Sequence, residues 1–482
     1  MYGAYEQTRT LDACAIEQLG LSEDILMENA AQALEQAADE YLGGVSDAHA
    51  AYDVLIAVGG GDNGADGWTL ARRIHKKYRA AVYAAKDPAS KACKRQAERA
   101  LACGVVQTKR LDSCAVLVEC IAGSGYVRRE PDEQLNALIA QLNAMNAYRI
   151  ACDIPAGLCR DGQTADTVFK ADITVTMGAP KTALYSDAAK DYTGRIVTAT
   201  LGVSQAVFTG PFKPDLMILE PHDMRLPLRT IQNTHKNSYG HCAVFAGAKE
   251  GAALIAAQAA LTFGAGLVSL VETGKPLACV PCELMHGNTL PRKTTAILAG
   301  PGLGEAGCEA AAEQIRQNPH IPAVFDADML ASAHIRPLLA QRAAPAVLTP
   351  HLGEFAALLD AYCIPHSDIP AERLSLLREL CARVPPHTVI VCKGANTCIG
   401  CRDAVYAAAG GSSALAKAGS GDVLAGMTAA LLAQGYGALD AACTAVLAHA
   451  QAAADFVRGA ADFALTPPAL IKAVSALRQP QA

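Results

Sequence analysis

Residues 416–426 read Ala-Lys-Ala-Gly-Ser-Gly-Asp-Val-Leu-Ala-Gly, and this stretch decides how the second half of the chain is interpreted. Glycine and serine lead directly into Asp422, which opens an apolar segment predicted to be a helix ending near Gln434-Gly435. Backbone N–H groups at the start of a helix have no partner within it, and the helix dipole adds positive potential there. A phosphate can therefore bind at this turn, and the glycines let it approach the backbone closely.

The carboxylate of Asp422 stands on the same turn, where it would repel a phosphate. Such a carboxylate is useful when it accepts a proton from the group that attacks phosphorus. The alternative is that Asp422 only caps the helix N-terminus. The stretch alone leaves both roles open, and the rest of the chain favours the catalytic one.

Length and composition set the broad class. A chain of 482 residues predicts two to four domains with sizeable cores. A net charge of −6 gives no sign of a nucleic-acid or anionic-membrane surface, so we expect neither partner. Residues 1–20 are polar, unlike a signal peptide. Residues 251–271 are apolar, but Gln258, Gly264 and Gly266 interrupt them and favour helix, turn and strand over a membrane span.

The 17 cysteines are an odd number without the paired spacing of zinc sites. Cys279 and Cys282 form one isolated C-x-x-C, and Cys398 and Cys401 form another on a predicted hairpin. A metal site at either pair is the less favoured alternative. We predict reduced thiols in a cytoplasmic protein, many of them acting as small core residues.

The first half alternates strands and helices. Residues 5–20 and 22–42 are predicted helices, and residues 53–58 a buried strand that enters a glycine-rich turn at 59–67 and a helix at 68–78. Further strands are predicted at 80–85, 115–119, 149–153 and 173–176. This alternation predicts a doubly wound parallel sheet, with ligands at the carboxyl ends of the strands. Three features follow strands there: residues 61–67, 119–126 and 153–157.

Prolines gather between residues 203 and 235, where we place the junction between two domains, 1–215 and 225–482. A second alternating series follows, with a helix at 252–263 and strands at 242–246, 267–271, 296–299, 323–326, 346–349 and 388–392. Glycine or polar residues end the later strands, at 300–304, 326–328, 350–354 and 393–397. We expect these ends and the Asp422 turn to converge on one edge of the sheet as an active site.

The motifs also carry a resemblance. The second half resembles the ADP-dependent dehydratases of NAD(P)H-hydrate repair, which have a ribokinase-like fold, through His235-Lys236 with Gly240, GAGLV (264–268), GPGLG (300–304), DAD (326–328), TPHLGE (349–354), KGANT (393–397) and GSGDVLAG (419–426). The first half resembles the partner epimerases, here expected to be Rossmann-like, through LMENA (26–30), GGGDNGADG (59–67), GSG (123–125) and DIPAGL (153–158). Two halves in this order are similar to the bifunctional bacterial repair enzymes.

The resemblance implies the chemistry of the second half. A hydroxyl added to the nicotinamide ring would be phosphorylated by ADP and lost as phosphate, leaving AMP, with Mg²⁺ beside the nucleotide. Asp422 would be the base. The resemblance places the hydrate at Ala252, Gly302, His351 and Asp422, and the nucleotide at Lys393, Gly394, Ala395, Asn396, Thr397, Gly419, Ser420 and Gly421. Simpler alternatives are a solvated surface lysine for Lys393 and a hydrogen-bonded loop histidine for His351.

For the first half the resemblance implies epimerisation of the R and S hydrates, with Asp153 as the candidate acid/base or ring-orienting carboxylate. The implied substrate residues are Asp62, Asn63, Gly64, Ala65, Asp66, Gly123, Ser124, Gly125, Tyr126 and Asp153, and those around a K⁺ ion are Asn63, Glu119 and Ala156. This chain departs from the family at the last two, where an aspartate and a serine are usual. Asp62 adds a charge beside the expected phosphates. We expect a weakened epimerase, or one that binds the ion differently.

One departure also affects the second half. Ala418 stands where the family usually has glycine, and a positive φ there would cost roughly 1 kcal/mol. We expect activity to survive.

Two other functions stay open. A ribokinase-like small-molecule kinase, acting for example on a vitamin-precursor alcohol, shares the GSGD turn but has no need of the first domain. A binding protein that holds a nucleotide or a partner suits the altered loop at 61–67 but leaves Asp422 unexplained. We also expect a homo-oligomer, with subunit contacts or buried core as alternative roles for the alanine-rich helices at 251–263 and 423–456.

Overall fold

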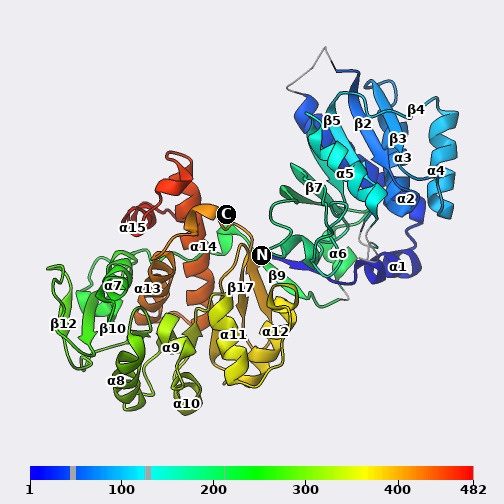
Figure 1. The fold of residues 1–482 in the computed structure, drawn as a ribbon. Coiled ribbons are helices and arrows are strands. Elements are labelled where there is room, and N and C mark those ends of the chain that lie inside the picture. Colours follow the sequence, from blue (N-terminus) through cyan, green and yellow to red (C-terminus); the bar gives the residue numbers. More distant parts are fainter. Residues whose placement is uncertain (44–49, 124, 126–131, 211, 481–482) are drawn as a thin grey trace. The chain divides into compact units, whose positions relative to one another are not determined.

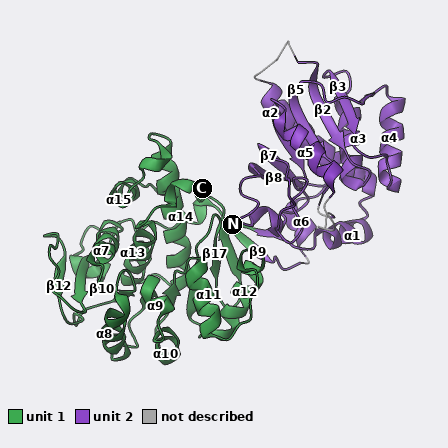
Figure 2. Cartoon of the chain, in the orientation of Figure 1, with its two compact units in different colours: residues 1–2, 217–482 green, residues 3–216 purple. Residues whose placement is uncertain are grey.

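The computed structural model describes the chain except residues 44–49, 124, 126–131, 211 and 481–482. It divides into two compact units, Gly3–Leu216 and Met217–Ala482, and Met1–Tyr2 group with the second (Figure 2). Each unit is described by itself.

The unit Gly3–Leu216 contains a seven-stranded parallel sheet in the order β4-β3-β2-β5-β6-β7-β8. The chain starts in the middle, at β2, and winds outward in both directions, so the strand order reverses between β2 and β5. Ligands of such sheets bind at that reversal, outside the carboxyl ends of the strands. The strands are β2 (Tyr52–Val58), β3 (Ala80–Ala84), β4 (Val106–Thr108), β5 (Cys114–Cys120), β6 (Tyr148–Cys152), β7 (Ile173–Met177) and β8 (Arg195–Ala199).

The helices of this unit are α1 (Thr8–Leu19), α2 (Glu23–Leu42), α3 (Asp62–Ile74), α4 (Lys91–Ala102), α5 (Glu133–Ala144) and α6 (Gln205–Thr209). The prediction of a turn at 59–67 followed by a helix at 68–78 is wrong at the boundary, because α3 (labelled in Figure 1) extends from Asp62 to Ile74 in the structure. Gly64 and Gly67 lie inside this helix, at positions where the packing leaves no room for a side chain. A Cβ at Gly64 would lie 2.0 Å from the Gly59 carbonyl oxygen, and one at Gly67 would lie 2.6 Å from Val58.

The sheet of the second unit has the order β1-β9-β18-β17-β16-β15-β14-β13-β10-β11-β12. The pairs formed among β10 to β16 are all parallel, as is the pair of β18 with β9, whereas β17 runs antiparallel to both β16 and β18. The order reverses between β10 and β13. The strands are β1 (Tyr2–Ala4), β9 (Leu216–Leu219), β10 (His241–Ala246), β11 (Leu267–Glu272), β12 (Met285–Gly287), β13 (Ala296–Ala299), β14 (Ala323–Phe325), β15 (Ala346–Leu348), β16 (Thr388–Cys392), β17 (Thr397–Gly400) and β18 (Val405–Ala408).

The helices of the second unit are α7 (Glu250–Thr262), α8 (Gly304–Arg316), α9 (Ala327–Ala331), α10 (Ile335–Gln341), α11 (Leu352–Ala361), α12 (Ile369–Arg383), α13 (Ser420–Ala433), α14 (Ala438–Val457) and α15 (Pro467–Ser475). Among the described residues no helix combines the length and apolarity that crossing a membrane requires. All 17 cysteines are free thiols, and Cys398 lies on the predicted hairpin.

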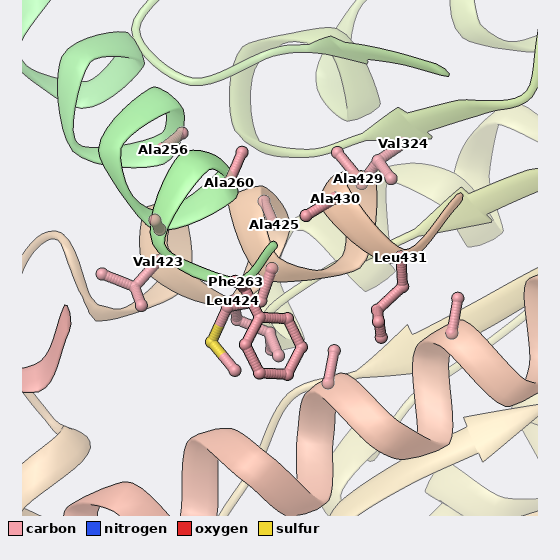
Figure 3. Packing of buried hydrophobic residues seen from close by; sticks show 14 of the residues in the cluster. Ala256, Ala260, Phe263, Val324, Val423, Leu424, Ala425, Ala429, Ala430 and Leu431 are labelled. Carbon is pink, nitrogen blue, oxygen red and sulfur yellow. The ribbon is translucent and has the colours of Figure 1, made fainter. Parts of the chain in front are cut away.

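Helix α13 runs through the core of this unit. Every residue from Val423 to Ala433 is buried, and the helix packs against α7 through small side chains such as Ala256, Ala260 and Ala425 (Figure 3). At Gly426 the two helices are in close contact, since a Cβ there would lie 2.2 Å from the Ala256 carbonyl oxygen. Of the two roles considered for this alanine-rich segment, the structure gives α13 the role of a buried core helix.

Candidate active sites

The ends of β14, β15 and β16 bring three charged side chains together in the second unit. The Lys393 ammonium lies 2.9 Å from Oδ1 of Asp326 and 3.7 Å from Oε2 of Glu354. Thr349 also donates a hydrogen bond to Asp326 Oδ1, at 2.8 Å. Burial lowers the pKa of Lys393, but the two carboxylates outweigh it and raise the pKa overall. The side chain is 20% exposed, so the alternative of a solvated surface lysine is wrong.

Asp422 faces this cluster from the first turn of α13. Burial raises its pKa to about 6, with a further rise from Asp326 and an opposing effect of Lys393. Gly419, not Asp422, occupies the N-cap position of α13, so the capping alternative does not account for this carboxylate. A half-buried carboxylate that titrates near neutrality is suited to accept a proton.

The glycines of the site have conformations that other residues avoid. Gly300, after β13, has φ +138°, and a Cβ there would lie 1.7 Å from the Asp326 carbonyl oxygen. Gly419 has φ +89°. Among the described residues, the non-glycine residues with positive φ are Lys76, Asp153, Ala327 and Cys363. Ala418 is therefore unstrained, and the penalty considered for it does not arise.

Helix α7 links two other predicted residues to the same edge of the sheet. A Cβ on Gly302 would lie 3.2 Å from the Ala252 Cβ, so these two positions adjoin. Ile255 follows one turn further along α7, and a Cβ on Gly419 would lie 3.3 Å from its Cδ1 atom. The predicted hydrate-binding positions Ala252 and Gly302 thus lie at the same end of α7 as the turn at residues 419–421, which we call the phosphate turn.

His351 is the N-cap of α11. Its Nδ1 accepts hydrogen bonds from the backbone N–H groups of Gly353 and Glu354, at 3.0 and 3.2 Å. Its Nε2 lies 3.1 Å from Oε1 of Glu354. The alternative of a hydrogen-bonded histidine is therefore confirmed. The ring is also 61% exposed, which leaves it accessible to a ligand at the edge of the cluster.

The predicted nucleotide loop connects β16 to β17. Gly394 and Ala395 are exposed, whereas Asn396 is buried, and buried Arg373 donates a hydrogen bond of 2.9 Å to the Asn396 carbonyl. A Cβ on Gly421 would lie 3.4 Å from the Lys393 ammonium, so the loop and the α13 turn meet. The convergence of strand ends on one edge is confirmed for residues 326, 354, 393 and 422.

Two residues of this cluster were missed as site residues. Asp326 and Glu354 stood in the DAD and TPHLGE motifs, but no role was assigned to them. The available signal was position, because each follows a buried parallel strand of the same sheet as Lys393.

In the first unit, Asp153 follows β6 in a left-handed conformation with φ +70°. Its Oδ1 forms an ion pair with buried Lys181 and accepts a 3.2 Å hydrogen bond from the Met177 N–H. Burial, followed by the charges of Asp153, Asp62 and Asp12, raises the pKa of Asp66 well above its usual value. Burial also raises the pKa of Asp12 to about 6. Sequence reasoning identified neither Asp12 nor Lys181.

Glu119, at the end of β5, is completely buried and tethers two loops. One carboxylate oxygen accepts from the N–H groups of Ile121 and Ala122, at 2.6 and 3.4 Å. The other accepts from the Ala156 N–H at 3.0 Å. Burial nevertheless raises the pKa of Glu119 to about 7.

Asn63 and Gly123 lie beside Asp153. The Asn63 amide donates a 3.3 Å hydrogen bond to the Cys152 carbonyl, and a Cβ on Gly123 would lie 3.2 Å from Asp153 Oδ2. Gly125 lies against the Arg9 guanidinium. Gly64 and Ala65 are buried in the first turn of α3, whereas Asp62 is exposed. Ser124 and Tyr126 lie outside the described residues.

Two family models match the chain. One described as NAD(P)H-hydrate dehydratase matches residues 242–475, and one described as YjeF-related protein N-terminus matches residues 23–183. A bifunctional NAD(P)H-hydrate repair enzyme Nnr of Helicobacter pylori is 38% identical, with 99% of this chain and 100% of that protein aligned. The Escherichia coli enzyme of the same name is 32% identical, over 83% of this chain and 80% of its own.

Among solved structures, the ADP/ATP-dependent NAD(P)H-hydrate dehydratase from Bacillus subtilis, co-crystallized with ATP/Mg²⁺, aligns with a TM-score of 0.46 and 26% identity. The alignment covers 54% of this chain and 96% of that one.

Proposed function

The chain belongs to the bifunctional NAD(P)H-hydrate repair enzymes, and from this premise we propose that its two units perform successive steps of repair. The domain 1–215 interconverts the R and S hydrates of NADH and NADPH. The domain 225–482 dehydrates the S hydrate with ADP as phosphoryl donor, releasing AMP and phosphate. The observation that supports this most is the Asp422 carboxylate, which lies on the N-terminal turn of α13 beside Lys393.

In the dehydratase, the turn at residues 419–421 holds the transferring phosphoryl group, with the Gly421 N–H as a donor since the Ser420 N–H bonds to the Lys417 carbonyl, and Lys393 neutralises part of the charge. The ring hydroxyl attacks phosphorus as Asp422 takes its proton, and the bond to the AMP oxygen breaks. The new C–O–phosphate bond then breaks, and loss of a ring proton restores the double bond. Phosphate is a far better leaving group than hydroxide, which is the reason for the first step.

Magnesium fits this site. Mg²⁺ prefers carboxylate oxygens and phosphate oxygens, and it is usually held by one or two carboxylates together with a nucleotide. Glu354 and Asp326 are the carboxylates beside Lys393 that would hold it. When bound, it would neutralise charge on the donor phosphates.

Potassium fits its expected site less well. The Glu119 oxygens already accept backbone N–H bonds, and the Ala156 carbonyl accepts one from Phe169, at 2.8 Å. These internal bonds compete with an ion for the same oxygens, so we propose an epimerase step that uses no ion. Asp153 moves the proton or orients the ring, with Lys181 holding its carboxylate in place. Whether this departure weakens the epimerase is tested by the R-to-S rate of the isolated 1–215 fragment. An R-to-S rate that keeps pace with the dehydratase of the full chain would contradict a weakened enzyme.

The small-molecule kinase is separated from this proposal by its product. The full chain is incubated with S-NADH hydrate, Mg²⁺ and ADP or ATP, and the nicotinamide and nucleotide products are identified. With ADP, the proposal predicts NADH, AMP and phosphate in equal amounts, and with ATP it predicts ADP in place of AMP. A stable phosphorylated product would favour the kinase, and no turnover would favour the binding protein.

We also propose a cytoplasmic homo-oligomer. The 17 free thiols are compatible with a reducing compartment. The subunit number is measured by light scattering of the purified chain, and a monomer would contradict the proposal.

A further inference from the structure

His449 lies behind the phosphate turn rather than in it. It belongs to α14 and is 7% exposed, and its Nε2 lies 3.0 Å from the Ser420 carbonyl oxygen (α13 and α14 are adjacent in Figure 1). A carbonyl oxygen only accepts hydrogen bonds. Nε2 therefore carries the proton and donates it.

The accepting carbonyl belongs to the same peptide unit as the N–H of Gly421. Ser420 is the first residue of α13, so the Gly421 N–H is one of the donors that have no partner inside the helix. A hydrogen bond to the carbonyl end of a peptide polarises the whole unit and strengthens its N–H as a donor. His449 thus acts on the phosphate turn from the protein side.

We propose that His449 is a positioning residue for phosphoryl transfer: by donating to the Ser420 carbonyl, it fixes and polarises the Ser420–Gly421 peptide that receives the transferring phosphoryl group. This inference rests on the proposed dehydratase function. It adds a residue from α14, an element that supplies none of the groups assigned to the site so far.

Charge and burial agree with this role. Burial, against the opposing effect of the Ser420 hydrogen bond and with a smaller contribution from the charge of Lys393, lowers the pKa of His449 to about 4. The ring is therefore neutral at neutral pH, and it donates a hydrogen bond without adding a positive charge.

The chain offers a matched control. His241, at the start of β10, is 6% exposed, and its Nε2 lies 2.8 Å from the Ser269 hydroxyl. It lies in the same unit, but at the amino end of its strand, whereas the site is at the carboxyl ends. Replacing either histidine with leucine removes a buried polar contact of the same kind.

The test compares His449→Leu, His449→Gln and His241→Leu in the full chain, with kcat, both KM values and Tm measured for each. His449→Leu should lower kcat at least about tenfold, as supporting partners of active-site groups do, with little change in either KM. His449→Gln keeps a side-chain N–H and should restore most of kcat. His241→Leu should lower Tm but keep kcat.

Three results would overturn the proposal: wild-type kcat in a folded His449→Leu protein, an equal loss of kcat in His241→Leu, or a His449→Gln protein as slow as the leucine variant. If His449→Leu does not fold, His449→Met serves as the variant without the donor.

A second readout does not depend on activity. The Gly421 amide proton, followed by NMR in the full chain, should shift upfield in His449→Leu and stay near its wild-type position in His241→Leu and His449→Gln. An unmoved Gly421 signal would overturn the polarisation claim. If the wild type shows no turnover with ADP or ATP, the proposed function fails, and the NMR comparison still decides the role of His449.

Discussion

Asp422 illustrates how burial and neighbouring charge prepare one residue for chemistry. Its replacement by asparagine keeps the shape of the turn but removes the proton acceptor, so kcat of S-hydrate dehydration should fall by about 10²–10⁴-fold. The measurement is single-substrate kinetics with ADP and Mg²⁺. The control is Asp360→Asn on the exposed side of α11, which should leave kcat unchanged. An Asp422→Asn protein with normal kcat would contradict the assignment.

The pH dependence follows from the same environment. Burial and Asp326 raise the pKa of Asp422 to about 6, so its basic, deprotonated form is lost as the pH falls through 6. The rate of dehydration should therefore decrease about tenfold per pH unit below that value, with one proton involved. A kcat profile in the range where Tm is constant checks this. A flat profile between pH 7 and 5 would argue against Asp422 as the base.

At the residue scale the sequence indicated which residues belong to the site, but not what each side chain contacts. The role of Lys393 could not be settled from the sequence, because its distance to Asp326 depends on two strand ends meeting at one edge. The bonds of His351 are local, but histidine is not among the residues that usually mark a helix N-cap. Lys181 was not identified because its contact with Asp153 joins two different strand ends.

Among the elements, the contact between α13 and α7 depends on Gly426. A Cβ there would lie 2.2 Å from a backbone oxygen, so Gly426→Ala should destabilise the second unit by about 1–3 kcal/mol. Gly251 in α7 has nothing within 4 Å of a Cβ, and Gly251→Ala should stabilise it by up to about 1 kcal/mol. Urea unfolding of both variants measures the contrast. Equal effects would contradict the packing explanation.

Glu119 connects the ends of β5 and β6. Glu119→Ala removes the acceptor of three backbone N–H groups and should destabilise the first unit by roughly 2–5 kcal/mol, while exposed Glu98→Ala should have almost no effect. Calorimetry of the full chain measures the change.

Replacing K⁺ with tetramethylammonium should leave wild-type epimerisation unchanged, and a strong K⁺ requirement would contradict the internal tether.

Most strands that are flanked by helices could be predicted, because buried parallel strands are short continuous apolar runs. Two of the missed strands, β4 and β12, are short and lie at sheet edges, where few buried residues mark a strand. Strand β9 was missed because its four apolar residues lie in the proline-rich segment. The start of α3 was misplaced because Gly64 and Gly67 look like turn residues. Their close contacts, of Gly64 with Gly59 and of Gly67 with Val58, are visible only in three dimensions.

For the whole molecule, the alternating pattern predicted two α/β sheets, and the motif order predicted the family. The division between compact units after Leu216 falls inside the proline-rich segment, whose strand β9 belongs to the second sheet. Composition could not reveal this, since pairing with β18 depends on distant residues.

The two activities should be separable by single substitutions in the intact chain. Asp153→Asn should stop repair of an R and S mixture once the S hydrate is consumed, apart from slow spontaneous epimerisation. Asp422→Asn should abolish recovery of NADH while R and S still interconvert, as followed by chromatography. Loss of both activities in either variant would contradict independent sites.

The central claim is tested most directly by the recovery of absorbance at the reduced-nicotinamide band when the wild-type chain receives mixed R and S NADH hydrates, ADP and Mg²⁺. The account predicts recovery of essentially all the hydrate, faster than spontaneous epimerisation allows. Recovery that stops near the S fraction would contradict a working epimerase, and no recovery with ADP or ATP would contradict the dehydratase itself.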